Sequence, residues 1–145
     1  MIEFMGAFFA SHLSVLPVIL PLFTAAALLL MGDGGGQSSH GGSKLRSSRM
    51  LSLTSTVVGA LLAWQLMANA SSGSLSVYPL GGWSAPFGIV LVVDRLSAMM
   101  LALTWTIAVP VLWYATGGWD SHGRYFHALF HFQLMGLSGA FVTGD

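Results

Sequence analysis

The sequence predicts an all-α membrane protein with about four transmembrane helices. Of its 145 residues, 54% are hydrophobic and 7% are charged, and the mean hydropathy is +0.75. A soluble domain carries about 25% charged residues. Four runs contain no Lys, Arg, Asp or Glu and approach the ~20 residues that a helix needs to cross a bilayer. These runs, which we expect to be the helices of one membrane domain over residues 1–145, are 13–31, 50–68, 96–116 and 125–143.

Composition also excludes several classes of function. The formal net charge is zero, so no basic field attracts nucleic acid. Cysteine is absent, which excludes disulfides and thiolate metal ligands. His12, His40 and His122 lie in or beside predicted loops, where we expect them to be solvated, and the histidines and carboxylates do not follow a metal-ligand spacing. We expect no bound metal and no cofactor.

The first run is interpreted as a retained span rather than a secretory signal, because Glu3 precedes it and no Lys or Arg does. Pro17 and Pro21 each remove a backbone donor, which predicts a kink near its start. The connector 32–49 is rich in Gly and Ser. Its composition predicts a flexible, exposed loop that contains Lys44, Arg46 and Arg49.

The segment between the second and third runs has two distinct parts. Residues 78–83, with the sequence YPLGGW, combine turn residues with aromatic side chains. Residues 87–93 form a short β-branched run that ends at the charged pair Asp94 and Arg95. We expect this run to be an extended or re-entrant segment at the outer surface. An alternative starts the third helix near Phe87, which would place both charges inside the membrane.

The distribution of basic residues predicts the orientation. Three basic residues of the first connector and Arg124 lie on one side of the predicted membrane, whereas Arg95 alone lies on the other. Lys and Arg favour the cytoplasmic side, so the N-terminus is expected outside. Five aromatic residues stand near predicted span boundaries, as interfacial aromatics do. They are Trp83, Trp113, Tyr114, Trp119 and Tyr125.

The fourth run carries a polar stripe. His127, His131, Ser138 and Asp145 are four, seven and seven residues apart, which places them close to one face of a helix, while Gln133 points elsewhere. An ionisable group in hydrocarbon is costly, so this face should meet protein or water. Because histidine titrates near neutral pH, one hypothesis is a contribution to a proton path. The alternative is that neutral imidazoles form hydrogen bonds to neighbouring helices or lie among the lipid headgroups.

Two further groups of residues invite a structural interpretation. Gly136 and Ala140, with Gly139 beside them, have the spacing that lets membrane helices approach closely, and we interpret them as packing residues. Asp94 and Arg95 are adjacent and opposite in charge, which favours a salt bridge at the membrane surface. A more specific alternative is that one of them pairs with another subunit or lines an ion entry route.

Three segments resemble a known family. Residues 80–98 (LGGWSAPFGIVLVVDRLSA), 126–145 (FHALFHFQLMGLSGAFVTGD) and the opening 13–22 (LSVLPVILPL) resemble the N-terminal part of the D subunit of the multi-subunit monovalent cation/proton antiporters of the Mrp, Pha or Mnh type. The DRLSA portion alone is also similar to the proton-pumping subunits of respiratory complex I and membrane hydrogenases. In the family pattern Gln is more usual at position 131 and Asn at position 138.

The resemblance implies a subunit of an antiporter that exchanges Na⁺ or K⁺ for protons, a secondary transporter rather than an enzyme. Its implied partners are the other membrane subunits of a hetero-oligomeric complex, the lipid bilayer of a bacterial inner membrane, monovalent cations and protons. The family's membrane glutamate and lysine lie beyond position 145, so the resemblance implies a truncated subunit. The alternatives are a proton-translocating subunit of a complex I-like NADH–quinone oxidoreductase or membrane hydrogenase, and a small structural membrane protein or non-functional remnant.

Overall fold

A computed structural model of the chain describes residues 12–32, 41–71, 76–79, 90–123 and 125–143. Over these residues the chain forms four α-helices, two short antiparallel strands and one 3₁₀ turn. In chain order these are α2 (Leu16–Met31), α3 (Gly41–Ser71), β1 (Ser76–Pro79), β2 (Val90–Val93), α4 (Arg95–Ala115), η2 (Trp119–Ser121) and α5 (Phe126–Val142). The prediction of a mainly helical chain is confirmed.

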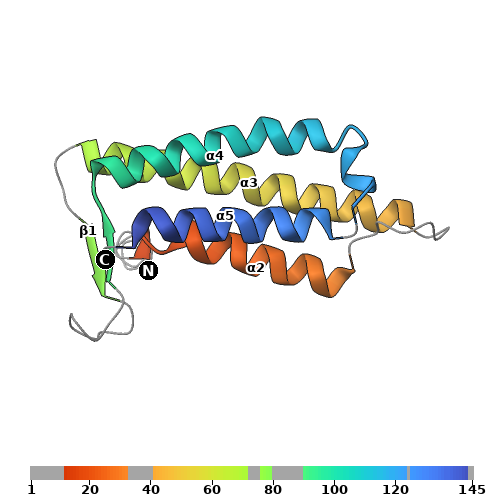
Figure 1. Cartoon of the computed structure of the whole chain (residues 1–145), viewed down its shortest axis with the longest axis horizontal. Coiled ribbons are helices and arrows are strands. Elements are labelled where there is room, and N and C mark those ends of the chain that lie inside the picture. Colours follow the sequence, from red (N-terminus) through yellow and green to blue (C-terminus); the bar gives the residue numbers. More distant parts are fainter. Residues whose placement is uncertain (1–11, 33–40, 72–75, 80–89, 124, 144–145) are drawn as a thin grey trace, which may run out of the picture.

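The four helices lie side by side along the long axis, and successive helices run in opposite directions (Figure 1). Helix α2 packs against α5 and α3, and α3 packs against α4. Strands β1 and β2 lie at one end of this bundle and η2 lies at the other (Figure 1). We call these the strand end and the η2 end.

Two of the helices are long and apolar enough to cross a membrane: α3, over its stretch Lys44–Ser71, and α4. Helices α2 and α5 are apolar but shorter, with 16 and 17 residues. At about 1.5 Å per residue they measure about 24 and 26 Å, slightly less than the ~30 Å of a hydrocarbon core.

The prediction of a loop throughout the first connector is wrong. Helix α3 begins at Gly41 rather than at residue 50, so Lys44, Arg46 and Arg49 are helical. Lys, Leu and Arg favour the helical conformation. In addition, Arg49 in this helix forms hydrogen bonds to an acidic side chain of η2. Residues 33–40 lie outside the described part of the chain.

The extended conformation predicted before Asp94 is confirmed for Val90–Val93, which form β2. This strand pairs antiparallel with β1 in the register Ser76↔Val93 to Pro79↔Val90, and its Leu91 also forms a bridge with Thr143 after α5. The alternative in which the third helix starts near Phe87 is wrong, because α4 starts at Arg95. Residues 80–89, which include the predicted turn, lie outside the described residues.

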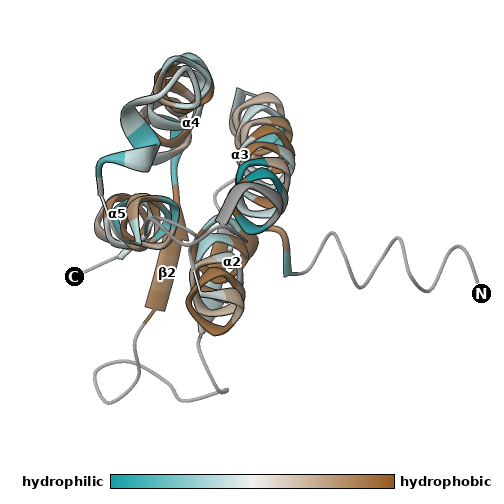
Figure 2. Ribbon diagram, turned by 90° about the vertical axis from the view of Figure 1, so that its right-hand side faces the viewer, coloured by the Kyte–Doolittle hydropathy of each residue, from teal (hydrophilic) through white to brown (hydrophobic). Residues whose placement is uncertain are grey.

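The interior of the bundle changes character along its length. Toward the strand end it is an apolar core around the fully buried Trp105, with members such as Leu66, Leu101 and Val142. Toward the η2 end buried polar side chains lie among apolar ones such as Leu28 and Leu112. Many large apolar side chains point outward instead, among them Leu30 and Leu61, and all four helices show hydrophobic stretches in Figure 2. Such a distribution is typical of helices that have lipid rather than water as their solvent.

Candidate functional site

The candidate site is the set of buried polar side chains between the helices that extends from η2 to the level of Trp105, which we call the polar seam. Each of its side chains is at most 7% exposed. The buried Ser and Thr side chains of α3, at positions 48, 52, 55 and 56, recur at the helical period and line one side of that helix. The members of the polar seam are Thr24 of α2, Ser48, Ser52, Ser55 and Thr56 of α3, Asp120 of η2, and His127, His131 and Ser138 of α5.

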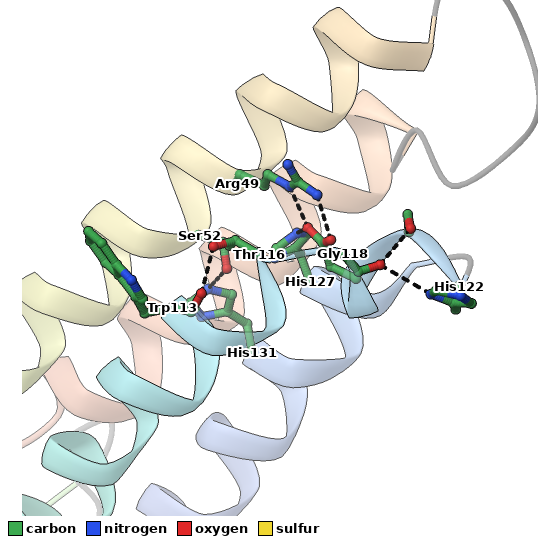
Figure 3. A network of polar contacts seen from close by, with 10 residues as sticks. Arg49, Ser52, Trp113, Thr116, Gly118, His122, His127 and His131 are labelled. Atoms are coloured by element: carbon green, nitrogen blue, oxygen red, sulfur yellow. Dashed lines mark hydrogen bonds and ion pairs between the residues drawn. The ribbon is translucent and has the colours of Figure 1, made fainter.

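An ion pair with a third partner closes the η2 end of the polar seam. Arg49 Nε donates to Asp120 Oδ2 at 2.6 Å, and the second guanidinium nitrogen donates to Oδ1 at 2.7 Å. His127 Nε2 lies 3.1 Å from Asp120 Oδ2. The side chains of Asp120 and His127 are fully buried, whereas Arg49 is 31% exposed. Side chains from α3, η2 and α5 therefore meet at one carboxylate (Figure 3).

These contacts determine the charge state of Asp120. Burial alone would raise the pKa of a carboxyl group, because it penalises the ionised form. The hydrogen bonds from Arg49 and then His127, together with the charge of Arg49, outweigh that penalty and hold the pKa of Asp120 below its usual range. The carboxylate is therefore ionised at neutral pH, and the bidentate geometry is that of a strong Arg–carboxylate pair.

One turn further along α5, His131 meets a hydroxyl of α3. Its Nε2 lies 3.0 Å from Ser52 Oγ, and both side chains are fully buried. A second contact between hydroxyls joins α2 to α3, where Thr24 Oγ1 lies 2.7 Å from Ser55 Oγ. Among the described residues neither His131 Nδ1 nor Ser48 Oγ has a hydrogen-bond partner, although both atoms are buried. A buried polar atom without a hydrogen-bond partner costs folding free energy. Packing of the helices alone therefore does not explain these side chains.

Trp105 connects the polar seam to the apolar core. Its Nε1 donates to Ser138 Oγ at 3.2 Å, across the interface between α4 and α5. Its six-membered ring lies against Gly59 of α3, where a Cβ atom would overlap the indole carbons. Three helices therefore depend on the position of one indole ring.

The residues singled out on α5 occupy distinct faces. His127, His131 and Ser138 are fully buried on the face that meets the rest of the bundle, whereas Gln133 is exposed. Asp145 lies outside the described residues. The role of this stripe in a proton path stays a prediction.

The small residues of α5 lie on a different surface. A Cβ added at Gly136 or Gly139 would meet no atom within 4 Å, and Ala140 is exposed. Within the described residues no helix packs closely on this surface, so a packing role for the three small residues stays a prediction.

Asp94 and Arg95 do not pair with each other in the described part of the chain. Asp94 is the N-cap of α4 and accepts a hydrogen bond from Ser97 N at 2.7 Å. This bond, with a further one from the Ser97 hydroxyl, holds the pKa of Asp94 below its usual range. Arg95 donates instead to the carbonyl of Ser71 at 3.2 Å. Geometry explains the difference from the predicted salt bridge, because neighbouring residues at a helix start point in different directions.

Two of the histidines predicted to be solvated lie among the described residues. His12 is half-buried and only partly solvated, because its Nδ1 lies 2.7 Å from Tyr78 Oη and joins the segment before α2 to β1. His122 is exposed, and its Nδ1 donates to the carbonyl of Gly118. His40 lies outside the described residues. Across the described ranges, no group of three or more His, Cys, Asp or Glu side chains could hold a metal ion.

Sequence reasoning missed the partners of the histidines. Asp120 and Arg49 are 71 residues apart, and nothing in their local sequence links them. A signal for Ser52 does exist, since Ser48, Ser52 and Ser55 follow the i, i+4, i+7 spacing of one helix face. The Gly- and Ser-rich composition around residue 48 obscures that spacing, because it favours a loop.

No family model matches the chain. Among curated proteins, it is 43% identical over 139 residues to the D subunit of a probable K⁺/H⁺ antiporter of Rhizobium meliloti (strain 1021), an alignment that covers 92% of this chain and 24% of the relative. The chain is homologous to antiporter D subunits. It spans about a quarter of the length of the D-subunit sequence that it matches. The resemblance inferred from the sequence is thereby confirmed.

Two solved structures share the fold of this D-subunit homologue. The Mrp complex from Dietzia sp. DQ12-45-1b matches with a TM-score of 0.79 at 24% identity, over 93% of this chain and 23% of that chain. The membrane-bound sulfane sulfur reductase, an archaeal respiratory membrane complex, matches with a TM-score of 0.72 at 21% identity, over 91% and 26% of the two chains. At these identities the two structures establish the arrangement of the helices.

Proposed function

We propose that this chain forms a membrane-embedded part of an antiporter D subunit, in a complex that exchanges protons for Na⁺ or K⁺. The supporting observation is the 43% identity to the D subunit of a probable K⁺/H⁺ antiporter along nearly the whole chain. The helix arrangement shared with an Mrp complex agrees with it. Because the chain spans about a quarter of that relative, the exchange activity is proposed for the whole complex and not for the isolated chain.

In this proposal all four helices cross a bacterial inner membrane, with the N-terminus outside. Exposed Lys44 and Arg46 belong to the η2 end, which would then be cytoplasmic, and Arg95 belongs to the strand end. The exposed side chains of Trp113, Tyr114 and Trp119 near the η2 end fit an interfacial aromatic belt.

The polar seam is proposed as a route for protons. Imidazoles take up and release protons near neutral pH, and hydroxyls both donate and accept hydrogen bonds. The supporting geometry is the succession of buried contacts from Asp120 to His127, and from His131 to Ser52 one turn along α5. Ser138, which accepts from Trp105, stands at the far end of this succession.

The complex that contains this chain can be tested in everted membrane vesicles from a bacterium without exchangers of its own. Respiration acidifies the vesicle interior, and a pH-sensitive dye reports the collapse of this gradient when a cation is added. We expect a response to Na⁺ or K⁺ and none to choline. If neither Na⁺ nor K⁺ produced a response, the proposed exchange would be contradicted.

The same assay tests the polar seam. Replacing both buried histidines with Ala, His127→Ala together with His131→Ala, should slow exchange at least severalfold. His122→Ala is the matched control, because His122 is exposed and lies outside the polar seam. Unchanged exchange in the double variant would remove the histidines from the proton route and leave the antiporter assignment intact.

A second candidate function is proton pumping driven by a redox partner. It is favoured by the fold shared with a respiratory membrane complex. Vesicles whose own respiratory chain is inhibited would then acidify when the redox partner receives its electron donor, at a rate independent of the alkali cation. Exchange that requires Na⁺ or K⁺ and proceeds on an imposed pH gradient, without an electron donor, rejects this candidate.

A further inference from the structure

The hydrogen-bonding capacity of Asp120 constrains the chemistry of His127. An ionised carboxylate accepts hydrogen bonds and donates none. Two bonds from Arg49 hold the Asp120 carboxylate in its ionised form. The 3.1 Å contact between His127 Nε2 and Asp120 Oδ2 is therefore a hydrogen bond only if Nε2 carries a proton.

This constraint applies to both charge states of the ring. Neutral imidazole has one N–H, which Asp120 places on Nε2, and imidazolium has an N–H on both nitrogens. The proton that distinguishes the two states is consequently the one on Nδ1. We propose that Asp120, held by Arg49, is a positioning residue that fixes the tautomer of His127, so that this histidine exchanges protons through Nδ1.

The charged and titratable groups that the structure places around His127 come from η2, α3 and α5. Among the described residues, Asp120 faces it from η2, Arg49 lies on the far side of that carboxylate on α3, and His131 is one turn away on α5. The sequence of α2 contains no titratable residue, and in α4 the charged Arg95 lies at the strand end. Among these contacts, the hydrogen bond from Nε2 to Asp120 is the one that specifies a tautomer.

His131 provides an internal contrast. Its Nε2 meets the hydroxyl of Ser52, which donates as readily as it accepts. The same ring geometry on the same helix face therefore leaves the tautomer of His131 open, whereas that of His127 is fixed. The partner of His127 can only accept a hydrogen bond, whereas the partner of His131 can donate or accept. Only in His127 is the nitrogen that takes up the second proton therefore specified.

The role in proton transfer depends on the proposed function, but the tautomer does not, so it is measured without transport. The full chain, labelled with ¹⁵N-histidine and reconstituted in lipid bilayers, is studied by solid-state NMR well above the ordinary imidazole pKa of about 6.5. The spectrum of His127→Gln identifies the signals of His127. We expect a protonated Nε2 and an unprotonated Nδ1 in the wild-type chain. A protonated Nδ1 with an unprotonated Nε2 overturns the proposal.

Variants separate positioning from general structure. Asp120→Asn offers both a donor and an acceptor, so His127 should lose its single tautomer, whereas Ser52→Ala should leave His127 unchanged. Wild-type tautomer in Asp120→Asn would overturn the role of Asp120, and if that variant does not fold, the wild-type spectrum alone decides. A fixed tautomer in a complex that exchanges no cation would refute the proposed function and leave this inference standing.

Discussion

The indole ring of Trp105 occupies the space beside Gly59 in which any other residue would carry its Cβ atom. Gly59→Ala should therefore force the ring or helix α3 to shift. Inserting a methyl group into a packed core costs about 1–3 kcal/mol. We expect a lower midpoint of thermal unfolding in detergent, followed by circular dichroism.

Gly136→Ala is the matched control for that substitution. It is also a helical glycine, but an added Cβ meets no atom within 4 Å. Replacing Gly with Ala in a helix then favours folding by about 0.5–1 kcal/mol. Equal destabilisation by both substitutions would show that the indole contact is not the cause.

The hydrogen bond between Trp105 and Ser138 is testable with a double-mutant cycle. Trp105→Phe removes the donor and Ser138→Ala the acceptor. A neutral buried hydrogen bond contributes about 0.5–1.5 kcal/mol, and the coupling between the two substitutions isolates it from the loss of ring volume. Additive effects on the free energy of unfolding would mean that the bond contributes nothing.

The ion pair between Arg49 and Asp120 should be sensitive to loss of one member. Arg49→Gln leaves a fully buried carboxylate without its cation, for which buried pairs lose about 3–5 kcal/mol, less here because Arg49 is 31% exposed. Lys44→Gln, an exposed change on the same helix, should alter stability by less than about 0.5 kcal/mol. Comparable losses in the two variants, measured by thermal unfolding, would argue against the pair.

The depressed pKa of Asp120 predicts an acid-sensitive fold. In an unfolded chain the carboxyl pKa is about 3.9, and in the folded protein it is lower. The stabilisation is thus complete above the unfolded value and is lost as pH falls toward the folded value. Thermal midpoints should drop below about pH 4, and Asp120→Asn should make this drop shallower. An unchanged slope in the variant would remove Asp120 as its source.

The proposed orientation can be tested by thiol labelling, because the chain has no native cysteine. Ser121→Cys places an exposed thiol on η2, and Val77→Cys places one on β1, where the side chain is 59% exposed. In intact cells a membrane-impermeant maleimide should label the β1 position and not the η2 position. The opposite pattern would reverse the orientation, and labelling at both positions would reject a membrane-spanning arrangement.

The sequence predicts the helices because their signal is local. Charge-free apolar runs locate all four, and the β-branched run before Asp94 indicates an extended segment. The largest error, the start of α3, arises because Gly and Ser favour a loop in the absence of tertiary contacts. Helix α3 starts earlier, and Arg49 within this added part has a buried partner, Asp120, that is distant in the sequence.

Only the part of the site that α5 contributes is predictable from the sequence. Spacing places His127 and His131 on a single face of α5, since helical periodicity depends on one segment alone. Their partners, Asp120 and Ser52, come from η2 and α3, and such pairings are decided by how the helices pack. The predicted Asp94–Arg95 salt bridge is wrong for the opposite reason, because adjacency in sequence does not imply contact.

The hydroxyl contact between Thr24 and Ser55 supports two opposite arrangements of hydrogen, since either oxygen is able to donate. The imidazole of His131 and Ser52 offer the same choice. Reversing the contact between Thr24 and Ser55 requires both hydroxyls to turn about their C–O bonds. Reversing the contact between His131 and Ser52 also requires the ring proton of His131 to move from one nitrogen to the other. Every heavy atom keeps its place in both cases, so the polarity of these hydrogen bonds can change without any motion of the helices.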